Sequence, residues 1–218
     1  MAGPCWASPT CRPRSSEARP AHIRPRPHRV QRRAAMSADP IQIPTDTALK
    51  RAYGKIPTSV AVITAVHDGT PIGMTVGSLA SVSLDPPLVS FYALDTSATA
   101  EWIVDEGRFQ VNLLAKGQEN LCFQYASKRR FEERFAEGTW TWSSQCLPQL
   151  NGCVLWLECE LHEHRAIGDH TMLVGRVLRA QEGAVDATPL VFYRSKLGEL
   201  DAKHIQMVQP HNFQWSLY

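Results

Sequence analysis

The strongest constraint on the fold lies in residues 73–91, where a polar stretch, a proline turn and an apolar run follow one another. Asp85-Pro86-Pro87 interrupts the segment, and the apolar run begins at Leu88. Two adjacent prolines remove two backbone donors and restrict φ, so the segment predicts two strands that meet at a turn. Small residues let a ligand approach the backbone, and hydroxyl groups can bond to it. The first strand is therefore a candidate ligand-binding strand, because it carries Gly73, Thr75, Gly77, Ser78, Ser81 and Ser83.

Most of the remaining chain also favours strands. β-Branched residues are frequent in 59–66, and the Asp68-Gly69 pair that follows is typical of a hairpin turn. Because turns join the strands, in place of regular crossover helices, we expect a mainly β, closed antiparallel barrel with a few peripheral helices. The further strands are predicted at 72–84, 88–94, 109–115, 153–165, 171–180 and 188–193, and the helices at 45–54, 97–106 and, with a break, 117–137.

The first 35 residues differ in composition from the rest of the chain. They hold eight arginines, one glutamate and six of the 15 prolines, whereas residues 36–218 hold 15 lysines and arginines against 20 acidic residues. This composition favours disorder over a packed element. A transit peptide, a nucleic-acid or membrane arm, and an upstream extension before a start at Met36 are the alternatives, and we favour the extension. The predicted organisation is a disordered tail at 1–35 and one domain at 36–218.

Several classes of protein are not predicted. No run of 18 apolar residues and no signal-peptide core is present, so we expect no membrane span. The six cysteines lack CxxC spacing, which is typical of buried thiols in a reducing cytoplasm. No glycine-rich dinucleotide or phosphate-binding motif occurs, and no Gly-x-Ser-x-Gly. No nucleic-acid partner is predicted for the domain, because the basic residues gather in the tail.

A possible metal site lies in the strand at 153–165. Glu160, His162 and His164 alternate, so they share one face of a strand, and two histidines at this spacing can hold a metal. No third ligand follows at a clear spacing. We therefore interpret the three residues as a solvated polar face and predict no metal site.

A series of motifs resembles the flavin reductase-like family of FMN-binding split barrels, from about Ala52 to Leu200. The resemblance implies a split barrel of antiparallel, Greek-key-like strands with FMN, or FAD, as cofactor. It rests on the order and spacing of the pieces along the chain. These are 56–65, the Gly-Met-Thr-Val run from Gly73, the Ser-Val-Ser-Leu-Asp-Pro-Pro-Leu-Val run at 81–89, Val111-Asn112-Leu113-Leu114, Leu150-Asn151-Gly152, Leu157-Glu158-Cys159, and Gly168-Asp169-His170 with Gly175.

The resemblance implies two sets of flavin ligands, one on the polar strand and one at the end of the next strand and in the loop after it. Ser97 and Thr99 suit a phosphate, since free N–H groups and the helix dipole at a helix N-terminus favour an anion. Carried over by position, the first set is Gly73, Met74, Thr75, Gly77 and Ser78, and the second is Tyr92, Ala93, Leu94, Ser97, Ala98 and Thr99.

Two positions depart from the family pattern. Gly77 stands where the family often has Asn or another polar residue, so a backbone contact to the flavin would replace a side-chain contact. Ala98 stands where some members have Arg, which leaves the phosphate with less positive charge. Arg129 or Arg130 would then supply the charge, or the affinity for flavin would be lower.

The nicotinamide side follows from the same resemblance. It implies His170 as the catalytic residue, by positioning and charge stabilisation, because hydride transfer between two stacked rings depends on their alignment. Phe192, Tyr193 and Arg194 occupy the place where family members contact NADH or NADPH. Leu197 replaces a Tyr that many members have at this point, and this departure bears on the nicotinamide contact.

The implied activity is that of an NAD(P)H:FMN oxidoreductase, a cytoplasmic homodimer whose reduced flavin supplies a separate monooxygenase. Two other hypotheses remain open. The first is a tightly FMN-binding electron carrier or oxidase without free flavin reductase activity, which the Leu197 departure favours. The second is a non-catalytic barrel that binds another ligand, such as haem.

Overall fold

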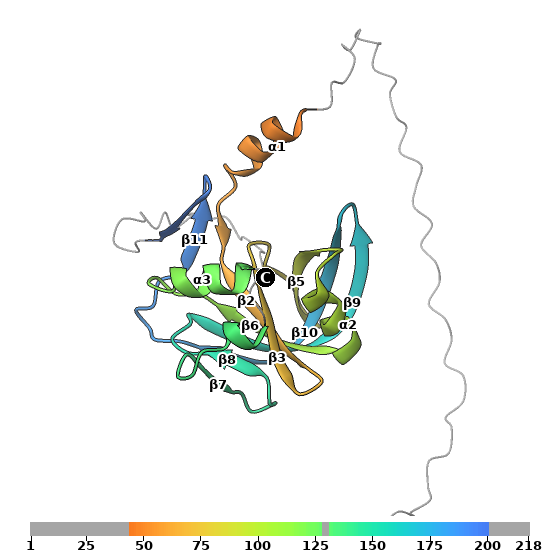
Figure 1. Cartoon of the computed structure of the whole chain (residues 1–218), viewed down its shortest axis with the longest axis vertical. Helices are drawn as coiled ribbons and strands as arrows, with labels where there is room; N and C mark the ends of the chain where they lie inside the picture. Colours follow the sequence, from red (N-terminus) through yellow and green to blue (C-terminus); the bar gives the residue numbers. More distant parts are fainter. Residues whose placement is uncertain (1–43, 128–130, 201–218) are drawn as a thin grey trace, which may run out of the picture. The chain divides into compact units, whose positions relative to one another are not determined.

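The structure, a computed structural model, describes residues 44–127 and 131–200 of the 218-residue chain (Figure 1). Its main sheet has seven strands in the order β3-β2-β6-β9-β10-β5-β4, and all neighbours are antiparallel. The predicted mainly β split barrel is therefore confirmed. The strands are β2 (Ala61–His67), β3 (Thr70–Val76), β4 (Ala80–Leu84), β5 (Pro87–Leu94), β6 (Arg108–Leu113), β9 (Leu155–Ile167) and β10 (His170–Glu182).

Hydrogen bonds between strands do not close this barrel. Within the described residues, β3 and β4 are the two edges of the main sheet and do not pair with each other. The expected closed barrel is thus an open, curved sheet with a split between β3 and β5. The turn between β4 and β5 includes the predicted Asp85-Pro86-Pro87 break, and its Asp85-Pro86 peptide bond is cis.

In the described residues, two small sheets and three short helices surround the main sheet. The helices are α1 (Asp46–Tyr53), α2 (Ala98–Glu106) and α3 (Glu119–Ala126), and the predicted break after α3 leads to a 3₁₀ turn, η1 (Phe131–Arg134). None of the described helices is long and apolar enough to cross a membrane. One small sheet joins β1 (Thr58–Ser59), β11 (Leu190–Tyr193) and β12 (Lys196–Glu199), and the other joins β7 (Trp140–Trp142) and β8 (Pro148–Leu150).

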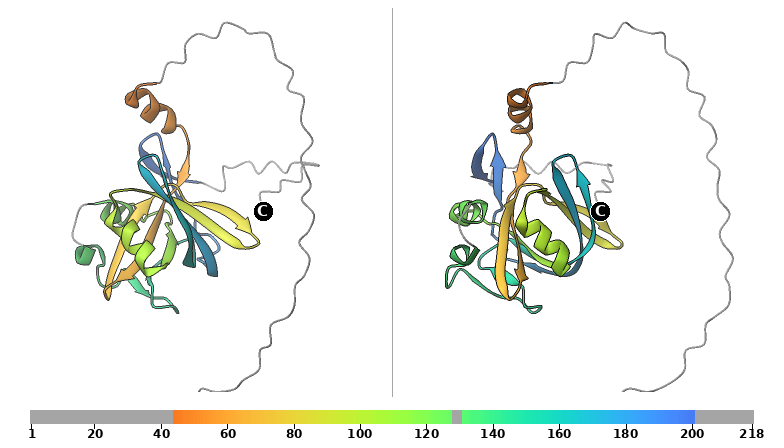
Figure 2. Two further views of the ribbon diagram at one scale, coloured as in Figure 1. Left: turned by 90° about the vertical axis from the view of Figure 1, so that its right-hand side faces the viewer. Right: turned by 45° about the vertical axis from the view of Figure 1, so that its right-hand side comes forward.

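The main core lies on the concave side of the curved sheet, where α2 packs (Figure 2). Ala100 and Ile103 of α2 are buried there among strand residues such as Ile63, Phe91 and Phe109. α2 begins at Ser97, whose hydroxyl accepts from the Ala100 N–H at 3.3 Å, and ends at Gly107 in the left-handed region. These two caps hold the helix with its N-terminus at the split.

The hairpin of β9 and β10 depends on a glycine at its bulge. The register shifts between Val174 and Gly175, and a Cβ added at Gly175 would overlap the ring of Phe109. Gly175 is therefore the motif residue that lets β10 pass over an aromatic ring in the core. The tail at 1–35 lies outside the described residues, and its separation from the domain stays a prediction.

Candidate active site

A cavity of about 640 Å³ opens at the split between β3 and β5. It gathers most of the residues that the resemblance indicated, from two strands, the start of α2 and the β9–β10 hairpin. The predicted residues in its wall are Met74, Thr75, Gly77, Ser78, Tyr92, Ala93, Leu94, Ser97, Ala98, Thr99 and His170. The wall is completed by residues that were not predicted, namely Val76, Thr96, Tyr125, Ala126, Ser127 and Arg134.

Gly73 lies just behind this wall. A Cβ added there would lie 3.0 Å from two ring carbons of Tyr125, so the glycine lets the Tyr125 ring pack against β3. Its carbonyl oxygen accepts a hydrogen bond from Arg134 Nη1 at 2.8 Å. Gly73 therefore shapes the cavity through its backbone and through the space that it leaves for Tyr125, although it does not itself line the cavity.

The hydroxyls of the polar strand are partly engaged within the protein. Thr75 Oγ1 donates to the carbonyl of Cys122 at 2.8 Å, which leaves it as an acceptor for a ligand. Ser78 Oγ accepts from the Tyr92 N–H at 2.9 Å and donates to the Tyr92 carbonyl at 3.2 Å. Ser78 thus joins the two sides of the split.

The Gly77 departure has a steric reason. A Cβ added at Gly77 would lie 3.2 Å from Thr58 Oγ1, which is closer than most Cβ contacts. A side chain at this position would require the Thr58 hydroxyl to shift by a few tenths of an ångström. The chain at 77 can therefore offer a ligand its backbone.

The N-terminus of α2 forms the part of the wall that is best suited to bind an anion. Ser97 Oγ caps the helix and also donates to Met74 Sδ at 3.4 Å, so β3 and the helix start are in contact. Thr99, in the first turn, is buried. Because the first N–H groups of a helix have no partner within it, this turn attracts a phosphate.

Arg134 is the charged residue among those in the cavity wall that the sequence did not indicate. Only 8% of its surface is exposed, and it donates to the carbonyls of Gly73 and Ser127, each at 2.8 Å. Burial lowers the pKa of Arg134, and nearby Tyr125 acts in the opposite direction. The sequence pointed instead to Arg129 and Arg130, which lie outside the described residues. No local pattern marks Arg134, since 61 positions separate it from Gly73.

His170 stands at the tip of the β9–β10 hairpin with its ring orientation set by a carboxylate. Its Nδ1 lies 2.7 Å from Asp169 Oδ1, and the Asp169 carbonyl accepts from the Asp95 N–H at 3.1 Å. The hydrogen bond from His170 holds the pKa of the Asp169 carboxyl below its usual range. Because an ionised carboxylate only accepts, Nδ1 carries the proton and Nε2 is left for a ligand.

The other predicted nicotinamide contacts lie on a different sheet. Tyr193 and Arg194 line a second cavity of about 610 Å³, together with Lys196 and Leu197. Phe192 pairs with Thr58, the residue that adjoins Gly77. Successive strand residues face opposite sides, so Phe192 lies on the side away from Tyr193. Within one chain, the structure does not bring Tyr193 and Arg194 into the first cavity.

A third cavity of about 350 Å³ adjoins the first, since Leu94 and Ser97 line both. In contrast to the first cavity, its wall is acidic. The ionisable side chains in it are Asp95, Glu101, Asp105 and His164. A negatively charged group would meet unfavourable potential there.

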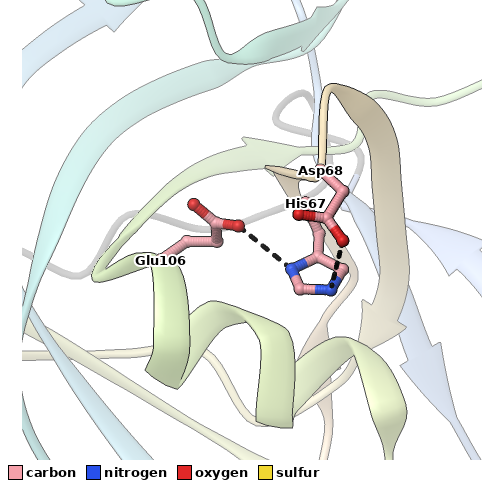
Figure 3. A group of neighbouring side chains, drawn as sticks. All are labelled: His67, Asp68 and Glu106. Atoms are coloured by element: carbon pink, nitrogen blue, oxygen red, sulfur yellow. Dashed lines mark hydrogen bonds and ion pairs between the residues drawn. The ribbon is translucent and has the colours of Figure 1, made fainter.

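The polar face of β9 agrees with its interpretation as solvated. His162 and His164 are exposed, and Glu160 forms an ion pair with Arg176. A different cluster joins the turn after β2 to the C-terminal end of α2 (Figure 3). His67 Nδ1 lies 3.0 Å from Glu106 Oε1, and Nε2 lies 3.7 Å from Asp68 Oδ2. Because each ring nitrogen faces its own carboxylate, the cluster ties the C-terminal end of α2 to the hairpin turn.

Comparisons with known proteins agree with this geometry. The flavin reductase like domain matches residues 53–201. A flavin reductase of Pseudomonas putida is 38% identical over 150 residues, which cover 68% of this chain and 86% of that protein. The reductase subunit HsaB of a flavin-dependent monooxygenase from Rhodococcus jostii (strain RHA1) is 36% identical over 163 residues, or 75% of this chain and 79% of HsaB.

Among solved structures, the NADH:FAD oxidoreductase SgcE6 of Streptomyces globisporus C-1027, in complex with NAD and FAD fragments, has a TM-score of 0.69. It is 28% identical, and the match covers 76% of this chain and 99% of SgcE6.

Proposed function

The chain belongs to the flavin reductase like domain family, and we propose that it is an NAD(P)H:FMN oxidoreductase that supplies reduced flavin to a partner monooxygenase. One observation carries the proposal. The cavity at the split combines an apolar wall, a helix N-terminus and a buried arginine. Its volume of about 640 Å³ lies within the range of small-molecule sites.

The donor set of the cavity fits a flavin mononucleotide. Met74, Val76 and Leu94 offer apolar surface for the ring system, and the backbone near Gly77 offers polar groups for its edge. The N-terminus of α2 and Arg134 suit the phosphate. When bound, the flavin supplies a ring that accepts a hydride from a nicotinamide.

The residues of the chain then bind and orient the two reactants. Asp169 holds the proton on Nδ1 of His170, so Nε2 can accept a hydrogen bond from a ligand at the cavity mouth. Hydride transfer needs close alignment of the donor and acceptor rings, and a fixed imidazole at the mouth supports that alignment. This is the catalytic role that we propose for His170. Phe192, Tyr193 and Arg194 remain proposed contacts of NADH or NADPH.

FMN is the proposed flavin, in preference to FAD. The N-terminus of α2 lies next to the acidic cavity, because Ser97 lines both cavities, so a second phosphate on that side would meet carboxylates. Asp95, Glu101 and Asp105 would repel it. The charge distribution therefore favours a flavin with one phosphate.

A homodimer in the cytoplasm is the proposed state of the protein. β4 is an edge strand on which Val82 and Leu84 are 53% and 64% exposed. An exposed apolar edge of this kind is suited to burial against a second copy. The cytoplasm is proposed because Cys122, Cys153 and Cys159 are buried free thiols. Light scattering of the unaltered chain and of Leu84→Lys tests the dimer, and the variant is expected to be monomeric.

The function is tested by oxidation of NADH and NADPH by the purified 218-residue chain, with and without added FMN, and by its visible spectrum. We expect turnover that rises with FMN. His170→Ala should lower kcat/KM by about 10- to 100-fold, because alignment is lost. His162→Ala, an exposed histidine on the same hairpin, is the matched control and should not change it.

The other outcomes separate the rival hypotheses. A flavin spectrum without FMN-dependent turnover would contradict the proposal and favour a tightly FMN-binding electron carrier. The absence of flavin binding would favour a barrel that holds another ligand.

A further inference from the structure

We propose that a row of aromatic side chains carries single electrons from the surface to the flavin cavity, and that it lets a light-excited flavin be reduced without a nicotinamide. The inference rests on the proposed flavin site and adds a second, one-electron activity to it. The aromatic path consists of Tyr125, Phe135, Trp140 and Trp142.

The aromatic path is continuous in the structure, and it leads from α3 past η1 to β7 (Figure 1). The ring centroid of Phe135 lies 5.2 Å from that of Tyr125 and 5.4 Å from that of Trp140. The centroids of Trp140 and Trp142 lie 4.8 Å apart. All three pairs meet edge to face, which is a favoured packing of aromatic rings. Because electron transfer weakens steeply with distance, such a row of neighbouring rings is an efficient route.

The two ends of the aromatic path lie where an electron route needs them. Tyr125 stands in the wall of the first cavity, which is the proposed flavin site. Trp142, the last residue of β7, is 53% exposed. Phe135, Trp140 and Trp142 also line a further cavity of about 320 Å³, where a small solute can approach the path. The path therefore joins the flavin site to the surface.

The members of the path differ in which of them can hold a positive charge. A phenol gives up an electron readily only when a base takes its proton. Among the described residues, the Tyr125 hydroxyl has no hydrogen-bond partner, and burial raises the pKa of this phenol. The phenyl ring of Phe135 is not readily oxidised. Tyr125 and Phe135 are therefore bridges, whereas the indole rings of Trp140 and Trp142 can each lose an electron before a proton leaves.

The proposed step is the one-electron oxidation of tryptophan by a light-excited flavin. Trp140 gives one electron to the flavin through Phe135 and Tyr125, and it becomes a radical cation. Trp142 then gives one electron to Trp140 and releases its indole proton to water. A thiol in solution restores Trp142 with one electron and one proton. After two such cycles the flavin has gained two electrons, and two protons from water, while two thiols have become one disulfide.

The test illuminates FMN bound to an excess of the 218-residue chain, for the unaltered protein, Trp140→Phe, Trp142→Phe and the control Trp102→Phe. Trp102 stacks on His67 at 4.8 Å. Transient absorption measures the tryptophan radical. Photoreduction is measured as the loss of oxidised flavin absorbance with dithiothreitol as the thiol and without NADH or NADPH.

Each variant has its own expected result. Trp140→Phe should abolish the radical, because the first electron donor is absent. Trp142→Phe should leave a radical on Trp140 that decays before the thiol reacts, because the charge cannot move on to the surface. Both variants should lose photoreduction, and Trp102→Phe should retain the radical and photoreduction.

An unchanged radical yield in Trp140→Phe would overturn the aromatic path, and so would an equal loss of photoreduction in Trp102→Phe. If Trp140→Phe fails to fold by circular dichroism, the exposed Trp142→Phe decides, and its photoreduction must fall. Turnover of NADH or NADPH in the dark tests the proposed function separately. Turnover without a light-induced radical would overturn the path alone, whereas a chain that binds no FMN would overturn the proposed function and the path with it.

Discussion

Ser78 and Tyr92 form a reciprocal pair across the split, in which the serine hydroxyl accepts from the Tyr92 N–H and donates to the Tyr92 carbonyl, at 2.9 and 3.2 Å. The pair joins the end of the polar strand to β5 at the mouth of the cavity. At this position, a side chain makes the link between strands that backbone hydrogen bonds make elsewhere in the barrel.

Ser78→Ala should therefore weaken FMN binding more than it weakens the fold. Two hydrogen bonds of about 1 kcal/mol each are lost, so we expect a fall in FMN affinity of about 5- to 30-fold. Fluorescence titration measures it, with Ser81→Ala, an exposed serine on β4, as control. An unchanged FMN affinity in Ser78→Ala would show that the pair does not support the site.

Gly175→Ala should destabilise the barrel. A Cβ there would overlap the Phe109 ring and lie 3.1 Å from Cys159 Cβ, so the core must shift. Overpacking of this kind costs about 1 to 3 kcal/mol in the free energy of unfolding, which urea denaturation measures. Gly198→Ala, where an added Cβ meets nothing within 4 Å, should be nearly neutral. Equal stability of the two variants would contradict the packing argument.

Asp169 should titrate below its usual range as long as His170 is present. The hydrogen bond from His170 lowers the pKa of Asp169, so the paired state is stabilised above the unfolded pKa of about 3.9. That contribution is lost as pH falls through the folded pKa. Carboxyl NMR titration should show the Asp169 pKa rising toward its ordinary value in His170→Ala. An identical titration curve for Asp169 in both proteins would contradict the proposal that this carboxylate orients the His170 imidazole.

The acidic cavity should set the choice between FMN and FAD. Glu101→Gln and Asp105→Asn each remove one negative charge from its wall. We expect each to raise FAD affinity by about threefold at low salt, with FMN affinity less affected. Asp186→Asn, in the exposed loop before β11, is the control. Binding is measured by fluorescence, and FAD affinity that does not respond to either variant would show that FAD leaves the site in another direction.

The cysteines should differ sharply in reactivity. Burial raises the pKa of the Cys153 and Cys159 thiols to about 12, whereas Cys146 is exposed. Iodoacetamide at pH 8 should modify Cys146 in the folded protein, and Cys153 and Cys159 only after unfolding, because the thiolate is the reactive form. Peptide mapping by mass spectrometry identifies the modified sites. Rapid modification of Cys153 in the folded state would contradict its place in the core.

The sequence indicates the barrel because its signals are local. The prolines at 86 and 87 mark the turn, and the Gly168-Asp169 pair marks the hairpin that the structure places between β9 and β10. Contiguous motifs also locate both walls of the cavity, since Met74 and Ser97 meet there. Residues that lie close together along one strand or one loop keep their relation in the fold.

Local signals do not predict the positions of three site residues, Arg134, Phe192 and Tyr193. Arg134 reaches Gly73 through η1, and nothing near it in the chain indicates that its guanidinium is buried. For β11, the motif locates the segment but not the direction in which each side chain points. Tyr193 lines the second cavity, and Phe192 lines neither the first nor the second. β3 and β4 are the two edges of the main sheet and do not pair with each other in the described residues. This gap depends on the curvature of all seven strands, which no single segment encodes.

The split has a mechanical consequence for a reductase whose flavin diffuses away. In the described part of the chain, β3 lies at an edge of the main sheet and faces β5 across the cavity without strand pairing. A flavin bound there would contact both sides of the split. Each release of the product would remove those contacts, so they would be lost and formed again in every catalytic cycle.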